Sequence, residues 1–327
     1  MNKPIVSIAV TTYNQEDYIA NTLDSLLMQQ TNFDFVIVIG EDCSSDNTLS
    51  ILHVYQSKYP NKILLLDSNK NYGSDLNLLR TIKACSGKFI AICDGDDYWI
   101  DSNKLQKQVD FLEQNSTYGT VATLRKDFME DSNSFISIAT NFTGAYSSID
   151  FKDFLFKNYI TASTVLFRSD LMCDFLDFFK SNNAISFNDY NFFLFFAHKM
   201  DVAILNVVTT VYRILPESGS HSNDPVKVWS FRKRFYVAIK FYLDFFKIDS
   251  SSKNSVLHYR ATVDYLFACN SKDFVTCNEF LQIFKDNKDF LRFFLLKMGM
   301  KNSTWNGFSF FIEKVNLRLG GVLLGKV

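Results

Sequence analysis

The sequence lacks an excess of charge of either sign, because 34 lysine and arginine side chains face 35 aspartate and glutamate side chains, for a formal net charge of −1 over 327 residues. No overall field attracts nucleic acid, and no nucleic-acid partner is expected. Also absent is a run of roughly 18 apolar residues, the length of a membrane-spanning helix. The apolar stretch at the N-terminus is too short for a secretory signal, so we expect a cytoplasmic protein.

Paired cysteines are missing as well. The six cysteines form no CxxC pair and show no zinc-finger spacing. We therefore expect free, reduced thiols, which fits a cytosolic protein. What the sequence has in abundance is aromatic residues, with 34 phenylalanines and 15 tyrosines concentrated towards the C-terminal half.

The first hundred residues alternate between short apolar runs and segments with apolar residues at helical spacing. The apolar runs show no internal alternation, as in strands that are covered on both faces. They occupy residues 5–10, 35–39, 63–66 and 89–93. This order predicts an α/β fold with a mostly parallel central sheet and flanking helices. The polar loops after the strands should gather at one sheet edge and form a single cleft.

The rest of the chain is expected to be mixed and then helical. Predicted helices cover residues 104–113 and 188–199, and predicted strands lie near 120–124, 135–139, 163–167 and 202–212. Loop-like sequence at 216–220 and 249–252 marks two linkers. We expect one domain over residues 1–225 and an α-helical C-terminal region over 226–327, with helices near 226–247, 254–270, 273–287 and 288–298.

An acidic segment with the sequence DGDDYW occupies residues 94–99, directly after a predicted strand. Its three carboxylates, on Asp94, Asp96 and Asp97, repel one another and resist desolvation. A hard divalent cation relieves this repulsion, and oxygen ligands suit Mg²⁺ or Mn²⁺. The position also fits, because ligands of α/β proteins bind beyond the carboxyl ends of the strands. The alternative is a solvated acidic turn in which Gly95 supplies the bend.

Three other polar segments follow predicted strands. The sequence TTYN at 11–14 offers hydroxyl, amide and backbone N–H groups near a helix start, which suits an anionic or heterocyclic ligand; an ordinary N-cap is the alternative. Glu41 and Asp42 close the second strand, where a carboxylate can bind sugar hydroxyls or a base N–H. Asn71 and Gly73 shape a loop that lets the backbone approach a ligand.

In this order and spacing, the segments resemble those of the family 2 glycosyltransferases of the GT-A type. The resemblance rests on VSIAVTTYN at 6–14, EDCSSDNT at 41–48, NYG at 71–73 and DGDDYW at 94–99. It continues more weakly through 163–168, 188–190 and 211–213 and ends near residue 222. It implies a Rossmann-like GT-A domain over 1–225, with a nucleotide-sugar half (1–100) and an acceptor half (101–225).

The resemblance also implies roles for single residues. Those that it places at the donor nucleotide are Thr12, Tyr13, Glu16, Glu41, Asp42, Asn71, Gly73 and Asp94, the last facing the ribose. Asp96 and Asp97 then face the diphosphate and a metal ion, Mn²⁺ or Mg²⁺. The ion would neutralise the charge that grows on the departing nucleoside diphosphate.

Asp189 stands where the family carries its catalytic carboxylate. As general base it would take the proton of the acceptor hydroxyl while that oxygen attacks the anomeric carbon from the opposite face, which inverts the configuration. The alternative, a helix N-cap, is compatible with that role. Arg213 is a candidate for the diphosphate, although an arginine at a strand end is as often part of a structural ion pair.

The sequence departs from its subgroup at Leu215, where relatives commonly carry a histidine that helps to hold the metal or the diphosphate. His221, on a glycine-containing loop, either takes over this role as a metal ligand or is a solvated loop residue. If the ligand is missing, donor binding survives and turnover is slow.

Aromatic residues recur at helical spacing in the C-terminal region, beside Arg232, Lys233 and Arg234. One interpretation is a packed helical subdomain, since wide apolar stripes face a core. The other is peripheral contact with anionic lipid at the inner face of the cell membrane. The second would suit an enzyme that extends a lipid-linked sugar.

The resemblance therefore predicts an inverting, metal-dependent glycosyltransferase. It would move a sugar from a nucleoside-diphosphate sugar, UDP-linked, to a saccharide or lipid-linked saccharide acceptor in the synthesis of bacterial surface polysaccharide. A nucleotidyltransferase is one alternative, but the segment TTYN does not supply the glycine-rich phosphate loop and nearby basic residue that it needs. A non-catalytic nucleotide-sugar-binding or scaffold protein is the other, and Leu215 is the argument for it.

Overall fold

The computed structural model describes residues 3–136, 144–182, 185–216 and 221–289. The chain divides into two compact units, an N-terminal unit (Met1–His221) and a C-terminal unit (Ser222–Val327).

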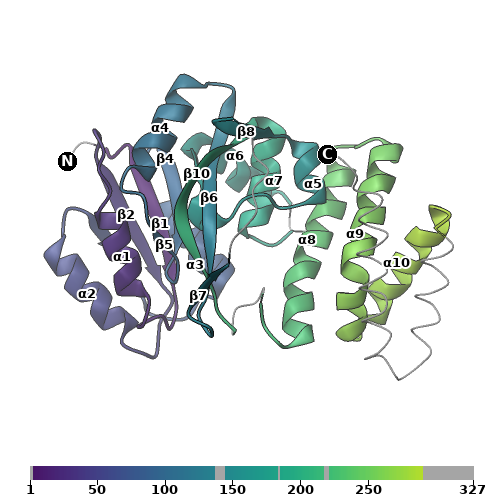
Figure 1. Cartoon of the computed structure of the whole chain (residues 1–327), viewed down its shortest axis with the longest axis horizontal. Helices are drawn as coiled ribbons and strands as arrows, with labels where there is room; N and C mark the ends of the chain where they lie inside the picture. Colours follow the sequence, from purple (N-terminus) through teal and green to yellow (C-terminus); the bar gives the residue numbers. More distant parts are fainter. Residues whose placement is uncertain (1–2, 137–143, 183–184, 217–220, 290–327) are drawn as a thin grey trace. The chain divides into compact units, whose positions relative to one another are not determined.

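Within the described part of the N-terminal unit, ten strands form one sheet (Figure 1). Their order is β3-β2-β1-β4-β9-β6-β10-β5, with β7 paired to β6 and β8 paired to β10. The strands are β1 (Val6–Thr12), β2 (Phe35–Glu41), β3 (Ile63–Leu65), β4 (Phe89–Asp94), β5 (Tyr98–Trp99), β6 (Tyr118–Met129), β7 (Ser134–Ile136), β8 (Tyr146–Ile149), β9 (Leu166–Arg168) and β10 (Asp201–Ile214).

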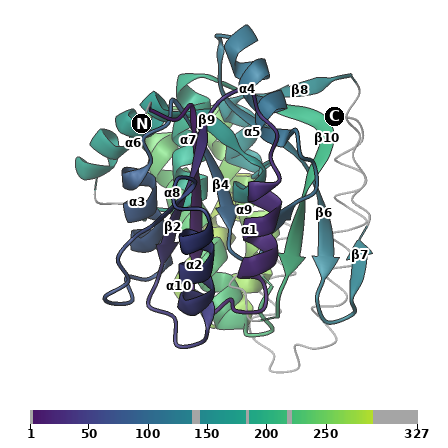
Figure 2. The ribbon, with the colours of Figure 1, turned by 90° about the vertical axis from the view of Figure 1, so that its left-hand side faces the viewer.

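The sheet is mostly parallel, as the sequence predicts. β3, β2, β1 and β4 pair in parallel, and so do β6 and β10. β9 lies antiparallel between β4 and β6, so that β6 and β10 run in the same direction as the first four strands. Figure 2 shows β6 and β10 side by side, with β7 beside β6. The carboxyl ends of β1, β2, β4, β6 and β10 therefore face the same edge of the sheet.

Helices pack against this sheet because their apolar stripes need a surface to bury. They are α1 (Ile19–Leu27), α2 (Thr48–Lys58), α3 (Ser74–Ala84), α4 (Lys104–Gln114), α5 (Phe151–Phe156), the short 3₁₀ helix η1 (Ala162–Thr164), α6 (Ser169–Lys180) and α7 (Asp189–Lys199). Ile19, Leu23 and Leu26 of α1 are completely buried and belong to the same core as Ile8 of β1 and Ala91 of β4.

Several elements differ from their predictions. The strand expected at 163–167 begins at Leu166, because residues 162–164 form the η1 turn. Residues 137–139 of the strand expected at 135–139 lie outside the described residues. The elements β5, β8, α5 and α6 were not predicted from the sequence. A two-residue strand such as β5 is too short to show any period of apolar residues.

The C-terminal unit contains α8 (Pro225–Phe245), α9 (Ser250–Asn270) and α10 (Phe274–Asp286), in agreement with the first three predicted helices. α8 packs on α9, and α9 packs on α10. Their aromatic side chains form a core of their own, which includes Trp229, Tyr236, Tyr265, Phe280 and Phe284. The fourth predicted helix (288–298) lies almost entirely outside the described residues.

Basic residues of α8 bind acidic residues of the neighbouring helices. Arg232 pairs with Asp264 at 2.6 Å, and Lys233 pairs with Asp273 at 2.8 Å. These contacts favour the packed subdomain, because the charges that lipid binding would need already have partners within the unit. Contact with a membrane stays a prediction. In the described stretches of the chain, no helix combines the length and the apolar character that crossing a membrane requires.

Candidate active site

Three of the predicted polar segments meet at the carboxyl edge of the sheet. In the strand register, Thr12 lies opposite Glu41, and Thr11 lies opposite Asp94. The backbone N–H of Gly95 donates to the carbonyl of Thr11 at 3.0 Å. The ends of β1, β2 and β4 thus form one site, as expected for ligand binding in an α/β sheet.

Asp97 is the deeply buried carboxylate of the acidic segment, with 1% of its surface exposed. Its Oδ2 accepts the hydroxyl of Ser163 at 2.5 Å, and its Oδ1 accepts the backbone N–H of Arg213 at 2.9 Å. Burial and the charges of Asp96 and Asp94 raise the pKa of Asp97 well above its usual range, against the effect of these two bonds. Because both oxygens have donors, Asp97 is tied into the protein, whereas Asp94 and Asp96 are partly exposed.

Asp189 acts electrostatically on the acidic segment. Burial, followed by the charges of Asp96 and Asp189, raises the pKa of Asp94 to about 7, against the lowering effect of the Thr11 hydroxyl. A charge acts in this way only at close range, which places Asp189 in the neighbourhood of Asp94. A bound cation would relieve this concentration of negative charge.

The donor set at the acidic segment suits a shared rather than a fully protein-held cation. Among the described residues, no group of three histidine, cysteine, aspartate or glutamate side chains is placed to hold a metal ion. Mg²⁺ typically takes one or two carboxylates and completes its shell with substrate phosphates and water. Asp94 and Asp96 fit that pattern, because they are the partly exposed oxygen donors of the segment.

Asp189 is the first residue of α7, and the preceding residue caps the helix. The side chain of Asn188 accepts the backbone N–H of Asn191 at 3.0 Å. Asp189 Oδ1 accepts the N–H of Tyr190 at 2.8 Å, and the carboxylate lies at the positive end of the helix dipole. The N-cap role therefore belongs to Asn188.

Helix α1 has a buried polar face that holds the acidic segment. This polar face was not predicted from the sequence. The Thr22 hydroxyl lies 2.8 Å from the carbonyl of Gly95 and 2.7 Å from the carbonyl of Asp97. Ser25 Oγ accepts the N–H of Trp99 at 3.0 Å. Polar residues at helical spacing on the face that also carries apolar core residues were the available signal.

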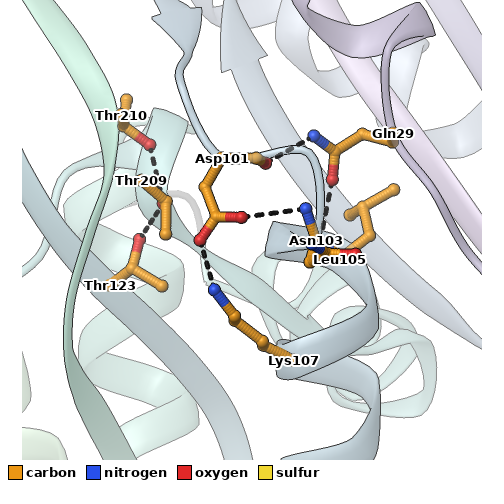
Figure 3. Close-up of polar contacts among 8 residues, drawn as sticks. All are labelled: Gln29, Asp101, Asn103, Leu105, Lys107, Thr123, Thr209 and Thr210. Atoms are coloured by element: carbon orange, nitrogen blue, oxygen red, sulfur yellow. Dashed lines mark hydrogen bonds and ion pairs between the residues drawn. The ribbon is translucent and has the colours of Figure 1, made fainter.

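Just beyond the C-terminal end of α1, Gln29 holds the segment that leads into α4 (Figure 3). Its amide nitrogen donates to the carbonyl of Asp101 at 2.8 Å, and its amide oxygen accepts the N–H of Leu105 at 3.0 Å. The carboxylate of Asp101 in turn accepts the N–H of Asn103 at 2.9 Å and pairs with Lys107 at 2.5 Å. The acidic segment is thus held along most of its length.

Thr12 carries an unused donor at the end of β1. Its side chain is 3% exposed, and its hydroxyl has no hydrogen-bond partner among the residues that the structure describes. Buried hydroxyls almost always have partners, so an unpaired one at a sheet edge fits a ligand contact. Close by, the neighbouring ring of Tyr13 is 48% exposed. The roles of Thr12 and Tyr13 at the nucleotide stay predictions.

Gly95 lies against this end of β1. A Cβ atom at Gly95 would come within 2.8 Å of Thr12 Cβ and would also collide with the amide oxygen of Gln15. Only glycine fits so close to strand β1. The turn of the acidic segment is therefore packed directly on β1.

Glu16 and Glu41 both use their carboxylates to order the loop after β2. Glu16 Oε2 accepts the backbone N–H of Asn47 at 2.9 Å and its side-chain amide at 2.6 Å. Glu41 is fully buried and accepts the backbone N–H groups of Cys43 at 3.0 Å and Ser44 at 2.6 Å. The roles of Glu16 and Glu41 at the nucleotide stay predictions.

Asp42 binds the loop that contains Asn71 and Gly73. Its carboxylate accepts the N–H of Tyr72 at 2.7 Å and the N–H of Gly73 at 3.0 Å. The amide oxygen of Asn71 also accepts the Gly73 N–H at 3.0 Å. Gly73 has a φ of +79°, which explains why this position suits glycine. These three predicted site residues are thus brought together, with Asp42 as the support of the loop.

Arg80 of α3 places a positive charge near the site. This residue was not predicted from the sequence. Its guanidinium lies 4.7 Å from the centre of the Tyr72 ring and donates to the carbonyl of Asp67 at 2.7 Å and to the carbonyl of Glu41. It therefore ties the ends of β2 and β3 to the ring of Tyr72. A single arginine inside a helical pattern gives no sequence signal for such a role.

Arg213 forms the ion pair that was the alternative interpretation. Its side chain pairs with Glu130 at 3.1 Å and donates to the amide oxygen of Asn21 at 3.1 Å. The guanidinium also lies 4.9 Å from the centre of the Tyr98 ring. Contact of Arg213 with a diphosphate stays a prediction, and it would require these bonds to rearrange.

His221 is exposed, and its ring lies 5.9 Å from that of Tyr212. Partial burial and the charge of Arg125 lower its pKa, against the charge of Asp127. The described residues do not gather His221 into a group of metal ligands, and its role at the metal stays a prediction. Leu215 is 6% exposed and packs as an apolar side chain.

Comparisons with known proteins identify the family of this chain. Residues 7–175 match the model of glycosyl transferase family 2, and the chain belongs to this family. It is 33% identical over 114 residues to the putative teichuronic acid biosynthesis glycosyltransferase TuaG of Bacillus subtilis, which covers 35% of this chain and 44% of TuaG. It is 34% identical over 111 residues to the poly(ribitol-phosphate) beta-N-acetylglucosaminyltransferase TarS of Staphylococcus aureus, which covers 33% of this chain and 19% of TarS. The chain thus matches less than half the length of these relatives.

Two solved structures share the fold. The crystal structure of TarS residues 1–349 with UDP-GlcNAc aligns with a TM-score of 0.57 at 18% identity and covers 90% of this chain and 91% of that one. The mannosyltransferase PcManGT of Pyrobaculum calidifontis, in complex with GDP-Man and Mn²⁺, aligns with a TM-score of 0.52 at 15% identity and covers 96% and 84%. The fold is GT-A, as the resemblance implied, and membership of the family favours glycosyl transfer over the nucleotidyltransferase alternative.

Proposed function

We propose that this chain transfers a sugar from a UDP-sugar to a hydroxyl group of a saccharide acceptor, with inversion of the anomeric configuration. The observation that carries the proposal is the placement of Asp189. Its charge contributes to the raised pKa of Asp94 at the end of β4, and Asn188, not Asp189, caps helix α7. A partly exposed carboxylate beside the predicted diphosphate site is what an inverting transferase needs as its base.

Asp189 would accept the proton of the acceptor hydroxyl as that oxygen attacks the anomeric carbon. A single displacement needs no covalent intermediate, so one base on the acceptor side is sufficient. The bond from the Tyr190 N–H orients the Asp189 carboxylate, which is the candidate proton acceptor. The hydrogen-bonded N-terminus of α7 would keep this orientation during the reaction.

The donor nucleotide would lie against the carboxyl ends of β1 and β2. The unpaired hydroxyl of Thr12 would donate to it, and the exposed ring of Tyr13 would pack on it. The loop of Asn71 and Gly73, supported by Asp42, would let the backbone approach it. UDP is the proposed nucleotide because the TarS structure that shares the fold was obtained with UDP-GlcNAc.

Asp94 and Asp96 would hold Mn²⁺ or Mg²⁺ together with oxygens of the diphosphate. When bound, the ion would neutralise the charge of the leaving nucleoside diphosphate. Asp97, with donors on both oxygens, would fix the shape of the segment rather than supply a free ligand. The complex of PcManGT with GDP-Man and Mn²⁺ supports the same ion class here.

The proposed acceptor is a saccharide or lipid-linked saccharide of a bacterial surface polysaccharide. Support comes from the names of the two relatives, which concern teichuronic acid and poly(ribitol phosphate). The identity of the sugar and of the linkage depends on side chains that the motifs do not specify.

The proposal is tested by UDP release from UDP-sugars with Mn²⁺ and an acceptor panel. Asp189→Asn should lower turnover at least about 100-fold, the usual contribution of a general base, and should leave UDP affinity unchanged. Asp170→Asn is a matched control, because Asp170 lies in the first turn of α6 and its Oδ1 accepts the N–H of the next residue at 2.9 Å. Full turnover in Asp189→Asn would contradict the assignment.

The scaffold alternative keeps one observation in its favour. Leu215 is buried and offers no ligand. The same assay separates the two functions. Binding of UDP-sugars without turnover on any acceptor would support the scaffold.

A further inference from the structure

Ser163 of η1 joins the acidic segment to the second half of the sheet. It is completely buried, and its hydroxyl makes two hydrogen bonds. It accepts the backbone N–H of Asp94 at 3.1 Å and donates to Oδ2 of Asp97 at 2.5 Å. One side chain therefore holds the backbone of one aspartate and the carboxylate of another.

The backbone carbonyl of Ser163 holds the far end of the same segment. It accepts the indole N–H of Trp99 at 2.8 Å and the hydroxyl of Thr210 at 3.3 Å. Thr210 continues into a buried row of hydroxyls, 3.3 Å to Thr209 and from there 2.7 Å to Thr123 (Figure 3). Ser163 thus contacts the beginning, the middle and the end of the segment from one side.

Helix α1 holds the acidic segment by contacts to the backbone of that segment. Thr22 of α1 bonds to the carbonyls of Gly95 and Asp97. The side-chain hydroxyls of Ser163 and Thr11 bond to carboxylates of the segment. The Thr11 bond to Asp94 is long, at 3.5 Å, and Ser163 provides the short one.

We infer that Ser163 is a positioning residue of the donor site, which sets the directions of Asp94 and Asp97 so that Asp94 and Asp96 face the diphosphate and its cation. The inference rests on the proposed function. Three carboxylates in a four-residue turn repel one another, so their arrangement depends on fixed donors nearby. Groups behind the ligands of a metal orient them and set their affinity. Ser163 also belongs to the predicted acceptor half, so it links that half to the metal site.

Ser163→Ala and Thr210→Val separate positioning from general packing. Both changes remove one buried hydroxyl, but the Thr210 hydroxyl bonds to the backbone carbonyl of Ser163 and to the hydroxyl of Thr209 rather than to the acidic segment. The measurement is the UDP dissociation constant by calorimetry, without metal and with Mn²⁺, beside thermal unfolding of the metal-free protein. Binding of Mn²⁺ in the presence of UDP, followed by electron paramagnetic resonance, gives a second readout that does not depend on turnover.

In Ser163→Ala we expect metal-free UDP binding within twofold of wild type and a loss of about tenfold in the affinity gained with Mn²⁺. In Thr210→Val both quantities should stay at the wild-type value. An undiminished gain with Mn²⁺ in Ser163→Ala overturns the inference, and so does an equal loss in Thr210→Val. If Ser163→Ala does not fold, Ser163→Cys replaces it, because a thiol has similar size but donates weakly, and the same loss is expected.

The outcomes for the wild-type chain keep this test apart from the proposed function. A wild-type protein that gains UDP affinity with Mn²⁺ but transfers no sugar contradicts the proposed catalysis and leaves the positioning role of Ser163 measurable. A wild-type protein with no gain from Mn²⁺ overturns the positioning inference, because no cation then needs the aspartates in place.

Discussion

Asn188 and Asp189 divide two tasks at the start of α7. Asn188 caps the helix by accepting the N–H of Asn191. The charge of Asp189, the next residue, contributes to the raised pKa of Asp94. From the sequence, both roles were open to Asp189 alone. The division makes stability and catalysis separable by mutation at adjacent positions.

Asn188→Ala should therefore lower the free energy of unfolding by about 1 kcal/mol, the usual value of an N-cap, and leave some UDP release. Asp189→Asn should do the reverse, with turnover lost and stability nearly unchanged. Urea unfolding and the UDP-release assay on the two variants check this. Loss of stability in Asp189→Asn comparable to that in Asn188→Ala would show that the tasks are not divided.

Gly95→Ala should destabilise the protein by about 1–3 kcal/mol, because the added methyl group collides with β1 in a close-packed site. The flexible end of Gln15 can move aside, but Thr12 Cβ, 2.8 Å from the new atom, cannot. The double variant Gln15→Ala/Gly95→Ala should consequently recover only part of the loss. Full recovery in urea unfolding would mean that Gln15 alone imposes the glycine.

Lys104 of α4 should give the unfolding free energy a pH dependence. Its side chain is completely buried, with Nζ donating to Gln108 at 2.7 Å, and burial lowers its pKa to about 7 from 10.5, against the charges of Cys93 and Asp101. Between these values the unfolded chain binds a proton that the folded chain lacks. The Lys104 contribution to stability therefore rises with pH above about 7, by at most about 1.4 kcal/mol per pH unit.

Urea unfolding of wild type and Lys104→Met at pH 7, 8 and 9 measures this contribution as the difference between the two proteins. The wild type should gain on the variant as the pH rises. Lys107→Met is the control, because Lys107 is 44% exposed and pairs with Asp101 at the surface. A constant difference between wild type and Lys104→Met would contradict the lowered pKa.

Stabilisation by Mn²⁺ with UDP should be larger at pH 8 than at pH 6. The pKa of Asp94 is raised to about 7, so at pH 6 a cation must displace a proton from this carboxylate, whereas at pH 8 the carboxylate is ionised. Thermal shift at the two pH values, with Asp94→Asn as comparison, checks the direction. Equal shifts in wild type at both values would exclude Asp94 as a ligand.

In the C-terminal unit, Asp264→Ala should cost about 3–5 kcal/mol, because it leaves buried positive charge without a partner. Asp264 is fully buried and pairs with Arg260 at 2.5 Å and with Arg232 at 2.6 Å. Asp177→Ala, which removes the exposed pair with Lys180, should cost less than about 1 kcal/mol. Urea unfolding followed by helical circular dichroism compares them, and similar losses would contradict the argument.

The sequence predicted the roles of carboxylates at strand ends less well than it predicted the fold. Glu41 and Asp42 were predicted to face the nucleotide, and the structure shows them accepting backbone N–H groups of loops. In a sequence, a carboxylate that binds a ligand and one that binds a loop look the same. Gln29 and Arg80 were not predicted for a related reason, since single polar residues form no motif, and Ser163 entered only as part of the weaker resemblance at 163–168.

The sequence by itself determined the alternation of strands and helices, the gathering of the polar segments at the carboxyl edge and the family. The reason is that burial on both faces marks each strand locally, and a parallel sheet brings successive loops together. Only the tertiary structure decided which groups hold the carboxylates. Ser163 reaches Asp94 across 69 positions of the chain, and Arg213 reaches Asp97 across 116. Contacts between such distant segments depend on how the whole sheet packs, which no local pattern records.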